Sequence, residues 1–145
     1  MTRHEPAELP DWAPGTVAIL STGGGEPHAI PVSTGVKAGP RAIMLALASG
    51  RESLARLRED PRCAVTVLAE GDVAVTAIGH ATVVEDPMEA ADGVVAVRIG
   101  VERIQDHWQD SFVIEEGARW RWTDDEAARR DEEIRQALEA LAGDG

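Results

Sequence analysis

Short runs of apolar and β-branched residues recur along the chain, separated by turns that contain glycine, proline or acidic residues. Runs of this kind, with few helix signals between them, are typical of antiparallel strands joined by hairpins. A parallel sheet would need a helix after nearly every strand, so the pattern predicts a mainly β, antiparallel barrel of six to seven strands. The predicted strands cover residues 17–22, 27–35, 41–48, 63–70, 73–84 and 94–104, with a less regular pair in 112–122.

Three of these runs carry features that predict where the strands lie in the sheet. Pro31 interrupts the second run, and because proline lacks a backbone donor, that strand is expected at an edge or a bulge. Gly79 lies in the middle of the fifth run, which indicates a bulge or a close approach of another backbone. From Val97 onward the sixth run alternates apolar and polar residues, so it is expected to be half-exposed.

The segment 50–62, after the third strand, has the signals of a short helix. Ser49 is predicted to cap it, with Glu52 as the capping-box partner, and Pro61 is predicted to end it. Leu54 and Leu57 are spaced for one buried face.

A second helix is predicted over residues 123–142. Thr123 is expected to cap this helix and Glu126 to complete the capping box. The apolar stripe that would face the barrel consists of Ala127, Ile134, Leu138 and Leu141.

The whole chain, 1–145, is expected to fold as one domain, with residues 1–15 as a lead-in whose prolines forbid a long helix. The start of the chain lacks the apolar stretch of a signal peptide, and no apolar run is long enough to span a membrane. A cytoplasmic location is therefore expected, without membrane association.

The charge balance excludes one class of function. With 14 basic and 26 acidic residues, the net charge is −12, which argues against a protein that coats nucleic acid by neutralising phosphates. Cys63 is the only cysteine and is expected to be a buried, inert thiol. No pair of histidines has the spacing of metal ligands, so no metal site is predicted.

Within this acidic chain, the predicted helix over 50–62 gathers four arginines: Arg51, Arg56, Arg58 and Arg62. The free N–H groups at a helix start, together with a guanidinium fork, favour an anion such as phosphate. The alternative is a solvated helix whose arginines pair with the neighbouring acids Glu52, Glu59 and Asp60.

The order of these elements resembles the FMN-binding split-barrel proteins of the pyridoxamine 5′-phosphate oxidase-like family. The resemblance covers roughly residues 15–105. It rests on the hairpin TVAILSTGGGEPHAIPV, the strand IMLALA leading into RESLARLREDPR, then CAVTV and the glycine-interrupted VAVTAIGHATVV. Asp60-Pro61 followed by Arg62 is the most recognisable local pattern.

The resemblance implies a split barrel that forms a homodimer, with FMN in a groove between the subunits. By similarity, Arg51, Ser53 and Arg56 would hold the phosphate. Many members have a lysine at the position of Ser53, so Arg51 is expected to serve in its place. The remaining residues implied for the flavin ring and ribityl chain are His28, Pro31, Val32, Ser33, Leu47, Ala48 and Ser49.

The function implied is that of an FMN-binding oxidoreductase acting on a small-molecule substrate. Two alternatives stay open: a deazaflavin-dependent reductase, and a non-enzymatic dimeric barrel that binds a small phosphorylated ligand or none. The pair Trp120 and Trp122 also has two interpretations. The indoles could plug the core under the terminal helix, which we favour, or form an aromatic wall of the cofactor groove.

Overall fold

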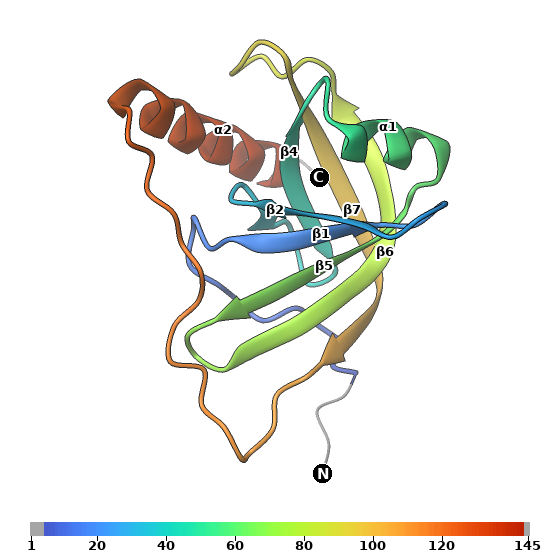
Figure 1. Cartoon of the computed structure of the whole chain (residues 1–145), viewed down its shortest axis with the longest axis vertical. Coiled ribbons are helices and arrows are strands. Elements are labelled where there is room, and N and C mark those ends of the chain that lie inside the picture. The colour runs from blue at the N-terminus through green and yellow to red at the C-terminus, as the bar shows by residue number, and fades with distance from the viewer. Residues whose placement is uncertain (1–4, 144–145) are drawn as a thin grey trace.

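The structure is a computed structural model that describes residues 5–143. Within this range, seven strands form one antiparallel sheet flanked by two helices (Figure 1). The mainly β architecture expected from the sequence is confirmed. In chain order the elements are β1 (Ala18–Thr22), β2 (His28–Val32), β3 (Val36–Lys37), β4 (Ala42–Ala48), α1 (Glu52–Glu59), β5 (Arg62–Ala69), β6 (Val73–Glu85), β7 (Val94–Asp106) and α2 (Asp125–Gly143).

The sheet is ordered β2-β1-β5-β6-β7-β4-β3 and curls into a half-barrel whose edges are β2 and β3. This arrangement is a split barrel. Pro31 lies in the edge strand β2, opposite Ile19 of β1, as its missing N–H predicted. The two-residue strand β3, which pairs with β4, was not predicted because so short a strand has no periodicity to detect.

The pairing of the long strands β6 and β7 is irregular at Gly79 of β6. The pairing register shifts between Ile78 and Gly79, because Glu102 of β7 has no partner on β6 there. The predicted bulge is therefore confirmed, with its extra residue on β7. A Cβ atom on Gly79 would lie 2.0 Å from the carbonyl oxygen of Gly100, so the two backbones approach too closely for any side chain. Both features that the sequence suggested for this glycine are therefore present.

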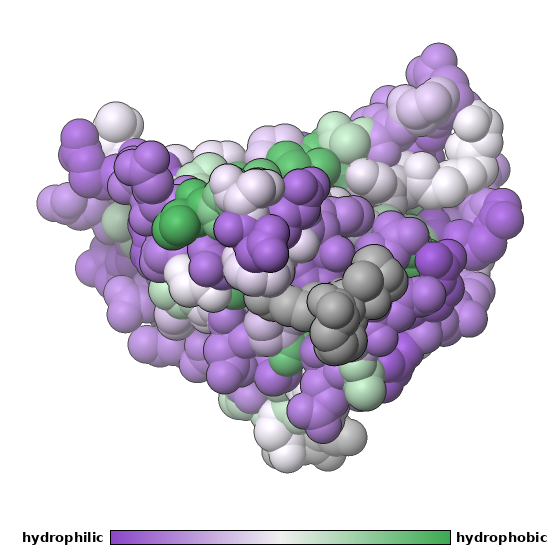
Figure 2. All heavy atoms as spheres, turned by 90° about the horizontal axis from the view of Figure 1, so that it is seen from below, coloured by the Kyte–Doolittle hydropathy of each residue, from purple (hydrophilic) through white to green (hydrophobic). Residues whose placement is uncertain are grey.

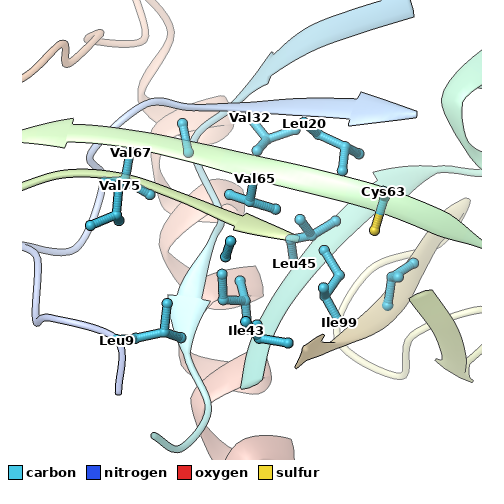
Figure 3. Close-up of a cluster of buried hydrophobic side chains, with 14 of the residues drawn as sticks. Leu9, Leu20, Val32, Ile43, Leu45, Cys63, Val65, Val67, Val75 and Ile99 are labelled. Atoms are coloured by element: carbon cyan, nitrogen blue, oxygen red, sulfur yellow. The ribbon is translucent and has the colours of Figure 1, made fainter. Parts of the chain in front are cut away.

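The main core fills the inside of the half-barrel (Figure 3). Inward-pointing side chains alternate along each strand, as in Val65 and Val67 of β5, and meet side chains from β1, β4 and β7. On β7, Val97, Ile99 and Val101 are buried whereas the residues between them are more exposed, as predicted. Leu9 of the N-terminal segment also enters this core.

A second core lies on the opposite face of β4 and β7, where α2 packs across the sheet. Ile134 and Leu138 of α2 are buried against Met44 and Ala96. Both belong to the predicted apolar stripe of this helix.

The predicted starts of both helices are wrong. Arg51, not Ser49, is the N-cap of α1, and it makes no side-chain capping bond. Ser49 instead forms a backbone hydrogen bond next to the start of β7, because its N–H donates to the carbonyl of Gly93. At α2 the first turn is capped by Asp124, whose Oδ1 accepts the N–H of Glu126, and not by Thr123.

The strands predicted within 112–122 do not form, apart from an isolated bridge between Thr16 and Arg119. Two N–H groups of this region donate to carboxylates instead: Ile114 to Asp72 and Gly117 to Glu70. We refer to residues 107–124 as the C-terminal arm. It runs along the outside of the molecule from β7 to α2 (Figure 1).

The surface agrees with the acidic, polar composition. On the face seen from below in Figure 2, hydrophilic residues dominate and hydrophobic residues form small separate patches. Among residues 5–143, no helix combines the length and apolar character needed to cross a membrane.

Candidate functional site at the start of α1

The helix α1 connects β4 to β5 and lies at one end of the half-barrel (Figure 1). Leu54 and Leu57 enter the main core, which confirms the predicted buried face and anchors the helix. Arg51 precedes the first turn and is exposed. We refer to the start of α1, with Arg51, Ser53 and Arg56 and the neighbouring His28, as the corner.

The start of α1 lacks a side-chain cap. The carbonyl of Arg51 accepts the N–H of Ala55, so the helical bonding begins there. The N–H groups of the first turn have no acceptor within the helix, by its geometry, and no side chain of residues 5–143 caps them. Such an end carries partial positive charge and favours an anion.

His28 joins β2 to this first turn. Its Nε2 atom lies 3.0 Å from the Oγ atom of Ser53, and its Nδ1 atom lies 3.5 Å from a carboxylate oxygen of Glu52. Ser53 is buried, with 1% of its surface exposed. The hydroxyl group expected to meet a phosphate is therefore engaged with the imidazole.

Arg56 holds the β1–β2 hairpin against α1. Its guanidinium donates to the carbonyls of Gly24 (3.2 Å) and Glu26 (2.8 Å), and its Nε donates to Glu52 (2.7 Å). The hydrogen bond from Arg56, reinforced by its charge and that of His28, lowers the pKa of Glu52. Glu52 thus stays anionic close to the start of the helix.

Two further arginines of this segment are also paired. Arg58 contacts Asp86 at 2.8 Å, and Arg62 contacts Asp60 at 2.7 Å. Hydrogen bonds from Arg62 lower the pKa of Asp60 to about 2. Since Arg56 also contacts Glu52, three of the four arginines, Arg56, Arg58 and Arg62, are paired with carboxylates.

Arg51 is the exception. Its side chain is exposed and makes no hydrogen bond or ion pair with any residue in the range 5–143. Its N–H donates to the carbonyl of Ala48, which keeps it next to the end of β4. Arg51 is therefore the cation of this segment that remains available for a ligand.

The other residues expected to line a cofactor are divided between surface and core. Pro31, Ala48 and Ser49 are exposed, whereas the side chains of Val32 and Leu47 are buried in the main core. Ser33 faces another part of the molecule, because its hydroxyl donates to Asp131 of α2 at 3.1 Å. The structure thus groups His28, Ser53 and Arg56 around the first turn of α1, which follows the N-cap Arg51, but places Ser33 elsewhere.

The hairpin carbonyls that hold Arg56 were missed by the sequence analysis. The Glu52–Arg56 spacing of four residues was visible in the sequence, but the contacts to Gly24 and Glu26 were not. They depend on how the hairpin folds back over α1, for which the sequence contains no local signal.

A small apolar pocket of about 240 Å³ adjoins the inner side of α1. It lies between Leu54 and Leu57 of the helix and Ala81 and Val83 of β6, and Arg58 lies at its edge. Within residues 5–143, no three His, Cys, Asp or Glu side chains group closely enough to hold a metal ion.

Solved structures place this fold in a known class. The chain is similar to a candidate pyridoxamine 5′-phosphate oxidase from Listeria innocua (17% identity, TM-score 0.51, 62% of this chain and 86% of that one). It is also similar to an FAD-binding protein from Mesorhizobium loti (16%, 0.51, 61% and 83%) and a candidate pyridoxamine 5′-phosphate oxidase from Lactobacillus delbrueckii (17%, 0.52, 62% and 83%).

The chain therefore has the split-barrel fold of the pyridoxamine 5′-phosphate oxidase-like proteins, as its sequence pattern suggested. At these identities the likeness concerns the fold. No protein-family model and no curated sequence matches the chain.

Proposed function

We propose that this protein binds flavin mononucleotide at the start of α1 and acts as a flavin-dependent oxidoreductase. The observation that carries the proposal is the uncapped first turn of α1 beside the unpaired Arg51. In an acidic chain, a free guanidinium at a helix start is a favourable place for a phosphate group. The names of the similar structures, which include an FAD-binding protein, support a flavin.

In this proposal each residue of the corner has a limited task. Arg51 and the first-turn N–H groups hold the phosphate, and the exposed Pro31, Ala48 and Ser49 border the rest of the cofactor. His28 and Arg56 hold the β1–β2 hairpin against α1, so that the corner has a fixed shape. The bound flavin would supply the redox chemistry. We further propose a homodimer whose second subunit completes the groove.

The test is a titration of FMN into the purified protein, followed by flavin fluorescence. Saturable binding is expected, and Arg51→Ala should weaken it about 10- to 100-fold, the range for a charge-assisted contact. Arg58→Ala, on the same helix but paired with Asp86, is the matched control and should leave the affinity unchanged. Absence of FMN uptake by the wild-type protein would refute the proposal, and an unchanged affinity of Arg51→Ala would remove Arg51 from the site.

One observation favours a second candidate, a non-enzymatic barrel that binds a small phosphorylated ligand through Arg51 and the first-turn N–H groups, or binds no ligand. Ser53 and Arg56, two of the three expected phosphate ligands, are already engaged with His28 and with the hairpin. In the first of these cases FMN does not bind, whereas inorganic phosphate raises the thermal midpoint of the wild type but not of Arg51→Ala. A deazaflavin-dependent reductase is distinguished by the same titration with a deazaflavin cofactor.

A further inference from the structure

A second hollow, of about 320 Å³, lies between the C-terminal arm and α2. Trp120, Arg121 and Trp122 of the arm line one side, and Asp131 and Arg135 of α2 line another. Ser33, which follows β2, also contributes to it. None of the residues grouped at the start of α1 lines this pocket.

The two indoles form aromatic walls of this pocket. The ring centroids of Trp120 and Trp122 are 6.0 Å apart and their planes meet at 68°. Both side chains are exposed, by 44% and 42%, so the favoured interpretation of a core plug is wrong. The buried face of α2 packs on the sheet instead, because Ile134 and Leu138 point toward β4 and not toward the arm. Large indole surface is thus left accessible, where it can bind an apolar ring.

The inner side of the pocket is polar, but its charged groups are already paired with one another or with neighbouring residues. Asp131, 9% exposed, accepts the hydroxyl of Ser33 and is paired with Arg135 one helical turn away. Arg119, a neighbour of the indoles, is paired with Glu70 at 3.3 Å. These groups therefore offer no net charge to a ligand.

Arg121 differs from these residues. It lies between the two tryptophans, lines the same pocket and makes no ion pair or hydrogen bond with any residue in the range 5–143. Glu132 is the one lining carboxylate without a partner in that range, and like Arg121 it is exposed to solvent. An unpaired guanidinium next to exposed aromatic faces suits a flat ring that carries a negative group.

We propose that this pocket binds a planar aromatic carboxylate. The ring lies against Trp120 and Trp122, and the carboxylate accepts hydrogen bonds from Arg121. The buried Ser33–Asp131–Arg135 group fixes α2 relative to the loop after β2 and so maintains the shape of the pocket. The site is independent of the proposed flavin site, with which it shares no charged residue.

The test uses naphthoate as the probe and naphthamide, which has the same ring without the charge, as its neutral counterpart. Calorimetric titration of the full chain should show saturable binding of naphthoate. Arg121→Gln should weaken it about tenfold or more, and so should Trp122→Ala through lost stacking. Arg129→Gln, an exposed arginine of α2 outside the pocket, is the matched control and should bind like the wild type.

Three results would overturn the proposal. The first is no saturable binding of naphthoate to the wild-type chain. The second is that the wild type binds naphthamide as tightly as naphthoate, or that Arg121→Gln binds naphthoate as tightly as the wild type. Either result would show that the charges of the carboxylate and of Arg121 play no part in binding. The third is loss of naphthoate binding in Arg51→Ala with Arg121→Gln unaffected, which would place the probe at α1. Since Arg121 is exposed, its variant is expected to fold, and the thermal midpoint verifies this.

Discussion

The imidazole of His28 and the hydroxyl of Ser53, 3.0 Å apart, tie an edge strand of the sheet to the first turn of α1. The strand β2 has a neighbour on one side alone, so its position depends on contacts of this kind as well as on β1. The same contact occupies a group that the sequence assigned to ligand binding. It is a structural bond at the border of the candidate site.

Ser53→Ala removes this hydrogen bond. The expected loss is about 1 kcal/mol of the free energy of unfolding, since His28 is half-buried and water can replace the hydroxyl. Denaturant unfolding of Ser53→Ala, His28→Ala and the double variant measures the coupling between the two residues. Ser49→Ala, at an exposed position, is the control. Strict additivity of the two single variants would show that the bond contributes nothing.

Gly79→Ala tests the close approach of β6 and β7. Because the added methyl would meet the backbone of Gly100 and not a flexible side chain, the loss should exceed about 4 kcal/mol or prevent folding. The control is Gly100→Ala, whose Cβ has open space and should change stability by less than about 0.5 kcal/mol. Equal, mild effects of the two substitutions would contradict the bulge geometry.

The fold could be predicted from the sequence because its signals are local. Alternation in 94–104, the edge proline Pro31 and the bulge glycine Gly79 each reflect the geometry of one strand. The strands expected in 112–122 failed because carboxylates of the β5–β6 turn, Asp72 and Glu70, take the N–H groups that would have formed a ladder. These hydrogen bonds join residues that are far apart in the sequence, so they leave no trace in the hydrophobic periodicity of residues 112–122.

The candidate site was less predictable for the same reason. The sequence placed four arginines on one short segment, but which of them remain unpaired depends on partners far along the chain. Arg58 meets Asp86 across 28 residues, and Arg56 meets the hairpin across about 30. Arg51 stands apart because it occupies the N-cap, before the first turn of the helix, and its side chain has no hydrogen-bond or ion-pair partner among residues 5–143.

Cys63 should be inert in the folded protein. Burial raises the pKa of its thiol to about 12, so almost none of the reactive thiolate is present at neutral pH. Reaction with a disulfide reagent such as dithionitrobenzoate should be negligible in the native state and stoichiometric in denaturant. Rapid labelling of the native protein would show that β5 is not packed as described.

Glu70 should make the stability of the C-terminal arm depend on pH. The N–H of Gly117 at 3.0 Å and the guanidinium of Arg119 lower the pKa of this carboxyl below its usual value of 4.5. A carboxyl whose pKa is lowered on folding stabilises the fold above its usual pKa, and this contribution is lost as the pH falls through the folded value.

Glu70→Gln should therefore lower the thermal midpoint at neutral pH, and the difference from the wild type should shrink on acidification below 4.5. The variant should also be cut faster by trypsin after Arg119 or Arg121, because the arm is held less firmly. Glu115→Gln, in the same arm, is the control for a change of charge alone. A difference that stays constant with pH would rule out ionised Glu70 as the tether.

Substitution of Arg56 should lower the stability of the protein, whereas substitution of Arg51 should weaken ligand binding and leave stability almost unchanged. Arg56→Ala removes two hydrogen bonds to hairpin carbonyls and the contact with Glu52, so we expect a loss of about 1–2 kcal/mol in the free energy of unfolding. Arg51→Ala removes no side-chain hydrogen bond or ion pair within residues 5–143 and should change stability by less than about 0.5 kcal/mol. Denaturant unfolding measures both, and the FMN titration is run on the same preparations. A stable Arg56→Ala together with a destabilised Arg51→Ala would reverse the roles assigned to the two arginines, because the hairpin would then depend on the residue that the structure leaves unpaired.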